Sequence, residues 1–335
     1  MASKRQLKTK LQAVANIKQM TRAMQLVAAT KMRKAQERAL KARPYAMRAL
    51  SLLSRIVRST ETEQVVGSLW QKRTLRPLRI PQGRQAQGKG KICLVVVTSD
   101  KGLCGSFNGA VLRIASRFIE EQAAKGEEIE IVAVGKKAKD FAKRKGIKLA
   151  AEFFQFSDLI GLDDALPLTQ WLLNGYQKNE YKEMSFCSTV FLSALLQKAL
   201  IYRLLPLEAG ELEQIVENII PKKGKYSDFV TPASPKLQRG EPKLGEGGLP
   251  YLLEPSSEAI VEELAKDLVE IAVLHLLFES NASEHSARMI AMKNATDNAE
   301  NLIETLTLDL NKLRQSGITQ ELTEISTAKE ALTSE

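Results

Sequence analysis

The chain has 335 residues, of which 44% are hydrophobic and 26% are charged, so it can bury a core of ordinary size. It has no run of about 18 uncharged apolar residues, which excludes a helix spanning a membrane. The net charge of +10 is unevenly placed: residues 1–58 hold 15 Lys/Arg against one acidic residue, and residues 256–335 hold 6 against 15 Asp/Glu. The two ends of the chain, at +14 and −9, are therefore expected to attract each other.

The first 58 residues predict one long helix. Glycine is absent, and the single proline, Pro44, marks a point for a bend. Apolar residues recur in steps of three and four, which places them on one face of a helix. These residues are Leu7, Leu11, Val14, Met24, Val27/Ala28, Met32, Ala35 and Ala39/Leu40. The stripe is narrow, so it needs a partner along its length.

The middle of the chain predicts an α/β domain over 91–207, after a polar connector at 59–90. Strands are expected at Lys91–Thr98, Glu130–Gly135, Phe186–Phe191 and Ala199–Leu205, with helices at Asn108–Lys125, 136–145 and 165–179. Alternation of strands and helices favours a doubly wound, mainly parallel, Rossmann-like sheet. Residues 208–250 become rich in Pro, Gly and Lys and predict an exposed insertion.

The C-terminal segment, 251–335, predicts a second long helix over 256–328. A helix of that length would span about 105 Å at about 1.5 Å per residue, which indicates a coiled coil. Its apolar stripe runs through Ile260, Leu264, Leu268, Ile271, His275, Phe278, Ala282, His285, Met289, Met292, Ala295, Ala299, Leu302, Leu306, Leu310 and Leu313. Thin stripes and opposite charges together predict that the two terminal helices pair as an antiparallel coiled coil.

Two glycine-rich segments have part of the pattern of a phosphate-binding loop. Gly83–Gly90 has no Ser or Thr after Lys89 to hold magnesium, and it precedes a strand instead of following one. Gly102–Gly109 does follow a strand and open a helix, but its glycine spacing is not that of a dinucleotide fingerprint. We expect a tight strand-to-helix turn there.

The remaining reactive side chains suggest no catalytic site. The cysteines Cys93, Cys104 and Cys187 form no CxxC pair, which argues against a zinc site; Cys104 would be reactive only at a helix N-terminus. His275 and His285 fall on the helical stripe and are expected to pack there. Asp163-Asp164 is expected to cap a helix. The basic first helix has no aromatic residue between Lys4 and Arg43 to stack on bases, which argues against nucleic-acid binding.

Three blocks of sequence resemble the γ subunit of F-type ATP synthases. They are IKQMTRAMQLVAATKMRKAQ at 17–36, TSDKGLCGSFN at 98–108, and ESNASEHSARMIAMKNATDNAENLIETLTLDLNKLRQSGITQELTEI at 279–325. The resemblance implies a central rotor stalk that couples ion flow through a membrane ring to ATP synthesis, and that is not itself an enzyme and holds no cofactor. It implies as partners the α and β nucleotide-binding subunits, an ε-type subunit and the membrane c-ring. It also implies a peripheral place on the cytoplasmic face of a bacterial plasma membrane, or on a thylakoid or other energy-transducing membrane.

The resemblance further assigns rotor–stator coupling to particular positions. Those positions are Met24, Lys31, Arg33, Lys34, Arg288, Gln315, Thr319 and Glu321. The chain departs from the family at its end, ISTAKEAL, and in the 208–250 insertion. That insertion lacks the cysteine pair of chloroplast members, so we expect no thiol switch; another latch against ATP hydrolysis is a hypothesis. The alternative function is a non-rotary coiled-coil scaffold or adaptor.

Overall fold

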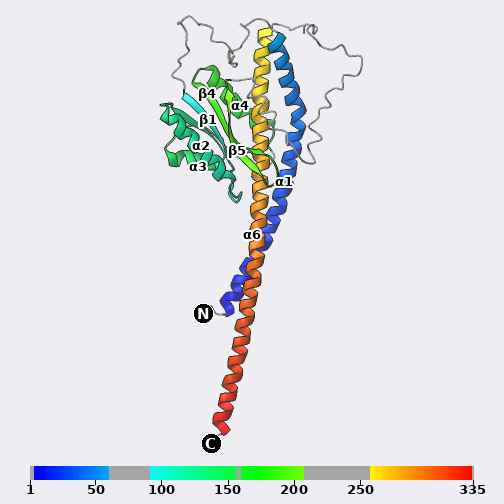
Figure 1. Cartoon of the computed structure of the whole chain (residues 1–335), viewed down its shortest axis with the longest axis vertical. Coiled ribbons are helices and arrows are strands. Elements are labelled where there is room, and N and C mark those ends of the chain that lie inside the picture. The colour runs from blue at the N-terminus through cyan, green and yellow to red at the C-terminus, as the bar shows by residue number, and fades with distance from the viewer. Residues whose placement is uncertain (1–3, 60–90, 155, 157–159, 207–256, 334–335) are drawn as a thin grey trace, which may run out of the picture. The chain divides into compact units, whose positions relative to one another are not determined.

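The computed structural model describes residues 4–59, 91–154, 156, 160–206 and 257–333 (Figure 1). The predicted connector at 59–90 and insertion at 208–250 therefore lie outside the described residues, apart from Ser59. The chain divides into two compact units. One comprises Met1–Ala29 and Arg288–Glu335, and the other comprises Thr30–Ala287. Each terminal helix contributes one part to each unit.

The two predicted terminal helices are confirmed. Helix α1 spans Lys4–Ser59 and continues through Pro44. Helix α6 spans Ser257–Thr333 and includes Gly317. A single glycine costs about 1 kcal/mol in a helix, which the many neighbouring helical residues outweigh.

The first unit is an antiparallel pair made of the beginning of α1 and the end of α6. Lys18 Nζ lies 2.8 Å from Glu300 Oε1, and the Thr21 and Thr296 hydroxyl oxygens lie 2.8 Å apart in the buried seam. Moving forward along α1 thus means moving backward along α6. Small or flexible residues line the seam, namely Ala28, Met292 and Ala299, together with Leu7 near the start of α1. Each hydroxyl also lies within hydrogen-bond distance of a carbonyl of its own helix, so neither depends on the other for a partner. The polar pair inside an apolar seam therefore favours one alignment of the two helices.

The second unit contains a five-stranded sheet in the order β3-β2-β1-β4-β5. The strands are β1 Lys91–Val97, β2 Ile129–Val134, β3 Leu149–Phe153, β4 Tyr181–Phe191 and β5 Gln197–Leu205. The first four are parallel, and β5 pairs antiparallel with β4. The helices between them are α2 Phe107–Ala124, α3 Lys136–Lys145 and α4 Leu162–Gln177. The mainly parallel, doubly wound sheet is confirmed.

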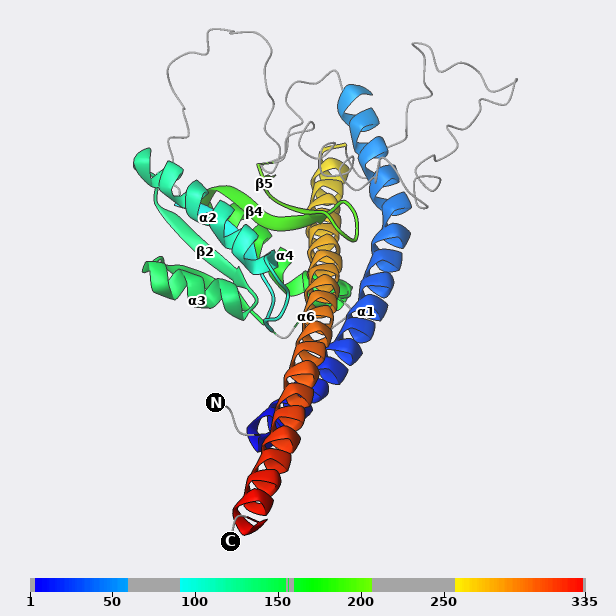
Figure 2. The ribbon, with the colours of Figure 1, turned by 60° about the horizontal axis from the view of Figure 1, so that its bottom comes forward.

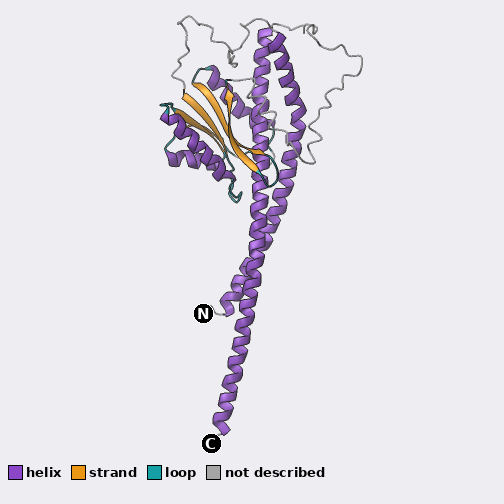
Figure 3. Ribbon diagram, viewed as in Figure 1, coloured by secondary structure: helices purple, strands orange, loops and turns teal. Residues whose placement is uncertain are grey.

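Helices cover both faces of this sheet (Figures 2 and 3). Alternate residues of β1 enter two separate cores, as a strand buried on both faces requires. Leu94 and Val96 pack with α2 and α3, and the cluster is completed by Val111, Ala115, Ala138, Phe141 and Ala142. Val95 and Val97 pack on the opposite face with α4 and α6, through Leu168, Leu172, Val269, Val273, Leu276 and Leu277. Helix α6 is therefore part of the core of the sheet domain.

The carboxyl ends of β1 and β2 meet in a close backbone contact at Gly135. Its φ is +91°, and a Cβ there would lie 2.2 Å from the Thr98 carbonyl oxygen. The Thr98 hydroxyl accepts a hydrogen bond from the Ala138 amide, 2.8 Å away, at the start of α3. Only glycine combines this conformation with this approach.

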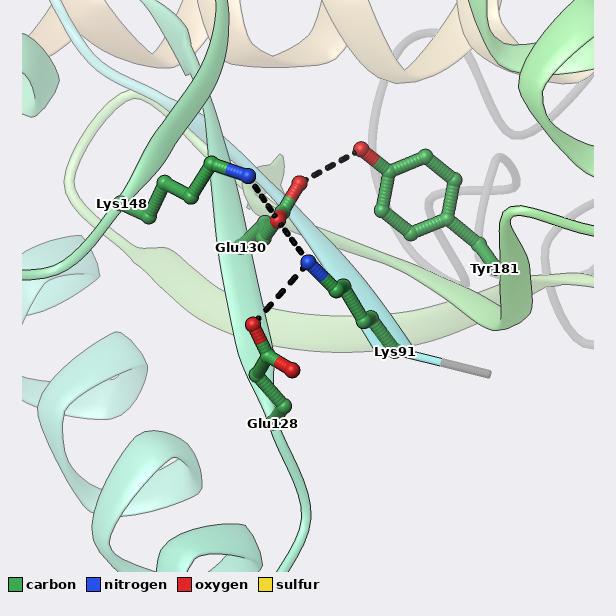
Figure 4. Close-up of polar contacts among 5 residues, drawn as sticks. All are labelled: Lys91, Glu128, Glu130, Lys148 and Tyr181. Carbon is green, nitrogen blue, oxygen red and sulfur yellow. Dashed lines mark hydrogen bonds and ion pairs between the residues drawn. The ribbon is translucent and has the colours of Figure 1, made fainter. Parts of the chain in front are cut away.

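An ion cluster joins the strands at the opposite, amino-terminal edge of the sheet (Figure 4). Its centre is Glu130 of β2, whose side chain is only 5% exposed. Lys91 of β1 and Lys148, just before β3, each place Nζ 2.7 Å from Glu130 Oε1. The Tyr181 hydroxyl of β4 donates to Oε2 at 2.8 Å, and Lys91 also lies 3.0 Å from Glu128. One carboxylate thus gathers groups from four consecutive strands of the sheet.

The cluster holds Glu130 in its charged form. Burial alone would raise its pKa, but hydrogen bonds from Lys148, Lys91 and Tyr181 outweigh burial and lower the pKa from 4.5 to about 2. The same contacts raise the pKa of Lys91, chiefly through its hydrogen bond to Glu130.

We predict that Glu130→Gln lowers the free energy of unfolding by about 1–3 kcal/mol at neutral pH, because it removes the charge that three donors share. Because the pKa of Glu130 is lower in the folded state than in the unfolded state, its charge stabilises the fold fully at pH values above the unfolded-state pKa. This stabilisation is lost as the pH falls toward the folded-state pKa. The difference between wild type and variant should therefore be constant above pH about 5 and shrink toward pH about 2. Urea unfolding across this range measures it. A difference that does not depend on pH would contradict the assignment.

We also predict that Gly135→Ala destabilises the second unit by about 3 kcal/mol or more, since its Cβ would overlap the backbone at Thr98. Gly146→Ala is the matched control. Gly146 also has a positive φ, +66°, but a Cβ there meets nothing within 4 Å. Its cost should be about 1 kcal/mol, from the backbone conformation alone. Thermal unfolding of both variants tests the difference, and equal costs would show that the contact with Thr98 does not matter.

Candidate functional site

The Gly102–Gly109 segment forms a closed strand-to-helix turn, as predicted. The Asn108 side chain accepts from the Ser99 amide at 3.0 Å and lies 3.1 Å from Cys104 Sγ. Cys104 is buried, three residues before α2 begins. Asp100 Oδ1 accepts from the Lys136 amide, 3.0 Å away, at the first residue of α3. The Asp100 side chain therefore occupies the start of α3, and Asn108 ties the turn before α2 to the end of β1.

The other candidates for chemistry are also accounted for by packing. Asp164 Oδ2 accepts from the Gly161 amide at 2.9 Å, which confirms that Asp164 caps α4. His275 is buried on α6, with Nε2 3.0 Å from Glu279 Oε1. His285 is buried as well. Within the described residues, no group of His, Cys, Asp and Glu side chains could hold a metal ion. The Gly83–Gly90 segment lies outside those residues.

The ion cluster and the thiols of Cys93 and Cys187 offer no reactive group. The pKa of Glu130 is lowered to about 2, so its carboxylate stays charged near neutral pH and is a poor general acid or base there. Burial raises the pKa of Cys187 to about 12, and burial also raises the pKa of Cys93. Both stay protonated and weakly nucleophilic.

The surfaces of the helices are the remaining candidate site. On α1, an apolar stripe lies outside the seam of the first unit. It consists of Ile17, Met20, Met24 and Val27, spaced by three, four and three residues, and each is at least 39% exposed. Those spacings place the four side chains on one helix face. An exposed apolar stripe of this kind is typical of a surface that contacts another protein.

This stripe corrects part of the sequence interpretation. Met24 and Val27 were assigned to the seam, but both are exposed, whereas Ala28 is buried. The seam prefers the smaller residue because helices approach closely there. Leu302 of α6, also assigned to the seam, is exposed. Ile17 and Met20 were missed; their three-residue spacing, offset from the first stripe, was the available signal.

The basic site residues of α1 lie in its second-unit part. Arg33 and Lys34 are exposed, and Lys31 is partly buried. Met32, between Lys31 and Arg33, and Ala35, after Lys34, are buried. Their burial fixes the rotation of the helix and so the direction in which the basic side chains point. Arg288 of α6 belongs to the first unit and is partly buried.

The end of α6 carries the last three site residues. Gln315, Thr319 and Glu321 are all exposed. Gln315 and Thr319 are brought together, since the Thr319 hydroxyl donates to the Gln315 carbonyl at 3.0 Å. Exposed apolar residues occur at the same end: Ile318, Leu322 and Ile325. Within the first unit these residues lie apart from Met24, because Thr21, three residues before Met24, already pairs with Thr296.

No helix among the described residues is long and apolar enough to span a membrane.

Comparison with known proteins identifies the family. A family model described as ATP synthase matches residues 3–332. The ATP synthase gamma chain of Chloroflexus aurantiacus is 35% identical over 334 residues, which cover 100% of both chains. The gamma chain of a Roseiflexus species is 36% identical over 333 residues, covering 99% of each.

Solved structures share the fold at lower identity. A chain from the Euglena gracilis mitochondrial ATP synthase rotor has a TM-score of 0.55 and 19% identity, covering 94% of this chain and 98% of that chain. A chain from the OSCP/F1/c-ring structure of the same enzyme has a TM-score of 0.58 and 18% identity, covering 98% of this chain and 94% of that chain. By its full-length sequence match, the chain belongs to the ATP synthase family, among the gamma chains.

Proposed function

We propose that this chain is the central rotor stalk of an F-type ATP synthase, coupling ion flow through a membrane ring to ATP synthesis by rotation. The observation that carries the proposal is the match to gamma chains over the whole length of both sequences. The two long helices suit the role. A stalk must transmit torque, and paired helices with an aligned seam resist twisting better than a single helix.

The helix surfaces supply the contacts that such a stalk requires. Met24 within the exposed apolar stripe, together with Lys31, Arg33 and Lys34, would touch the surrounding nucleotide-binding subunits. Arg288, Gln315, Thr319 and Glu321 would do so from α6. The exposure of most of these side chains supports the assignment, because they are not needed for the described packing. Shallow, adaptable contacts suit a surface that must leave one partner for the next, and methionine adapts well.

The proposed partners are the α and β nucleotide-binding subunits, an ε-type subunit and the membrane c-ring. The chain itself would be non-catalytic and peripheral, on the cytoplasmic face of a bacterial plasma membrane. The start of α3, which Asp100 occupies, and the closed turn at Asn108 support a role without bound nucleotide.

Co-purification tests the proposal against a free scaffold. A tag on this chain, in its native cells, should recover an assembly that hydrolyses ATP, whereas the isolated chain should show no ATP binding in the micromolar range by calorimetry. Recovery of the chain without nucleotide-binding subunits would favour the scaffold.

A charge reversal tests the coupling surface. The resemblance implies that the basic residues Arg33 and Lys34 face acidic loops of the ring. Arg33→Glu combined with Lys34→Glu should then repel those loops and lower ATP-driven ion pumping more than ATP hydrolysis in membrane vesicles. The fold should be unaffected, since both side chains are exposed. The matched control is Lys143→Glu with Arg144→Glu, an exposed adjacent basic pair on α3. Equal loss of pumping in both variants would show that α1 holds no special contact.

A further inference from the structure

The turn between β4 and β5, residues 192–196, exposes three leucines on the second unit. Leu195 at its tip is 83% exposed, Leu196 is 59% exposed and Leu192 is 40% exposed. The segment Leu-Ser-Ala-Leu-Leu contains no charge. Exposed leucines in a single short turn are costly in water and mark a contact surface.

The turn is held rigidly. The Ser193 amide donates to the Leu196 carbonyl at 2.9 Å, and the Leu196 amide donates back to the Ser193 hydroxyl at 3.0 Å. Gln197 extends its side-chain amide over the turn, with Nε2 2.9 Å from the Ala194 carbonyl. With its polar groups bonded internally, the turn presents its leucines outward in a fixed arrangement, which lowers the entropic cost of binding.

The turn is also fastened to α6, beside which it lies in Figures 1 and 2. The Ser286 hydroxyl donates to the Ala194 carbonyl at 2.6 Å, and the Ser283 hydroxyl lies 3.5 Å from the Thr189 carbonyl. Ser286 lies one residue before Ala287, the last residue of α6 in this unit. The turn therefore contacts α6 close to the point where the helix leaves the second unit.

We propose that this leucine turn docks against an apolar surface at the rim of the ring of nucleotide-binding subunits. The inference rests on the proposed function, which places the continuation of α6 inside that ring. The turn is fastened to α6 within one helical turn of the residue where that continuation begins. An uncharged, rigid, leucine-bearing tip fits an apolar patch and forms no strong polar bonds that would hold the rotor in one position.

Photo-cross-linking in the assembled enzyme tests the docking. A benzoylphenylalanine residue in place of Leu195, illuminated during ATP turnover so that each rotary position is sampled, should cross-link to a nucleotide-binding subunit. The same residue in place of Ala124 is the control. Ala124 is exposed at the end of α2, at the opposite end of the sheet, just before β2 begins, and should not form this product. Adding Gln197→Ala should reduce the cross-link at position 195, because the tip loses its support.

The outcomes separate the docking from the proposed function. If the chain does not co-purify with a ring, the proposed function fails and the docking fails with it. If the ring assembles but position 195 gives no product, or a product only with an ε-type or membrane-ring subunit, the docking is wrong while the function stands. As a second measurement, Leu195→Glu with Leu196→Glu should lower ion pumping per ATP hydrolysed; unchanged pumping would overturn the docking even if a cross-link forms.

Discussion

A parallel sheet needs cover on both faces, and in this chain part of that cover is the long helix α6. Val269, Val273 and Leu277 of α6 are buried in the same core as Val95 of the central strand. The helix cannot turn about its axis without taking these side chains out of that core. Burial of several aliphatic side chains, at about 1.5–3 kcal/mol each, therefore fixes the second unit's part of α6 on the sheet.

The fold was largely predictable because its signals are local. Long apolar stripes with steps of three and four residues predicted both terminal helices, and the run Ile92–Val97 predicted the central strand. Strand β3, Leu149–Phe153, was missed because its residues are mostly half-buried and show no alternation. The packing of α6 on the sheet was also missed. A helical stripe predicts that a partner exists but does not identify it, so Leu268–Phe278 looked like more of the coiled-coil seam.

The candidate site was predictable from the sequence only where a side chain bonds residues close to it in the sequence. The strand-to-helix turn around Asn108 and the cap at Asp164 follow from local chemistry, and the structure confirms both. The sequence pattern places Met24 in the seam, because spacings of three and four residues fit both the buried face and the exposed face of a helix. Only the pairing of α1 with α6 shows which face is buried. The coupling residues of α6 stay a prediction, since their partners belong to other chains.

Past Leu313, the described residues of α6 are almost all exposed, and the pairing of Lys18 with Glu300 places the start of α1 near that point. The last turns are then held by their own backbone bonds, several of them shared with threonine hydroxyls such as Thr323 and Thr327. A helical end without tertiary cover frays, and its amides should exchange with solvent far faster than those at Val273. Binding of a partner around this end would order it, and the chain would lose conformational entropy. Part of the favourable free energy of the contacts would offset that loss, so the net binding free energy would be smaller than the contact area suggests.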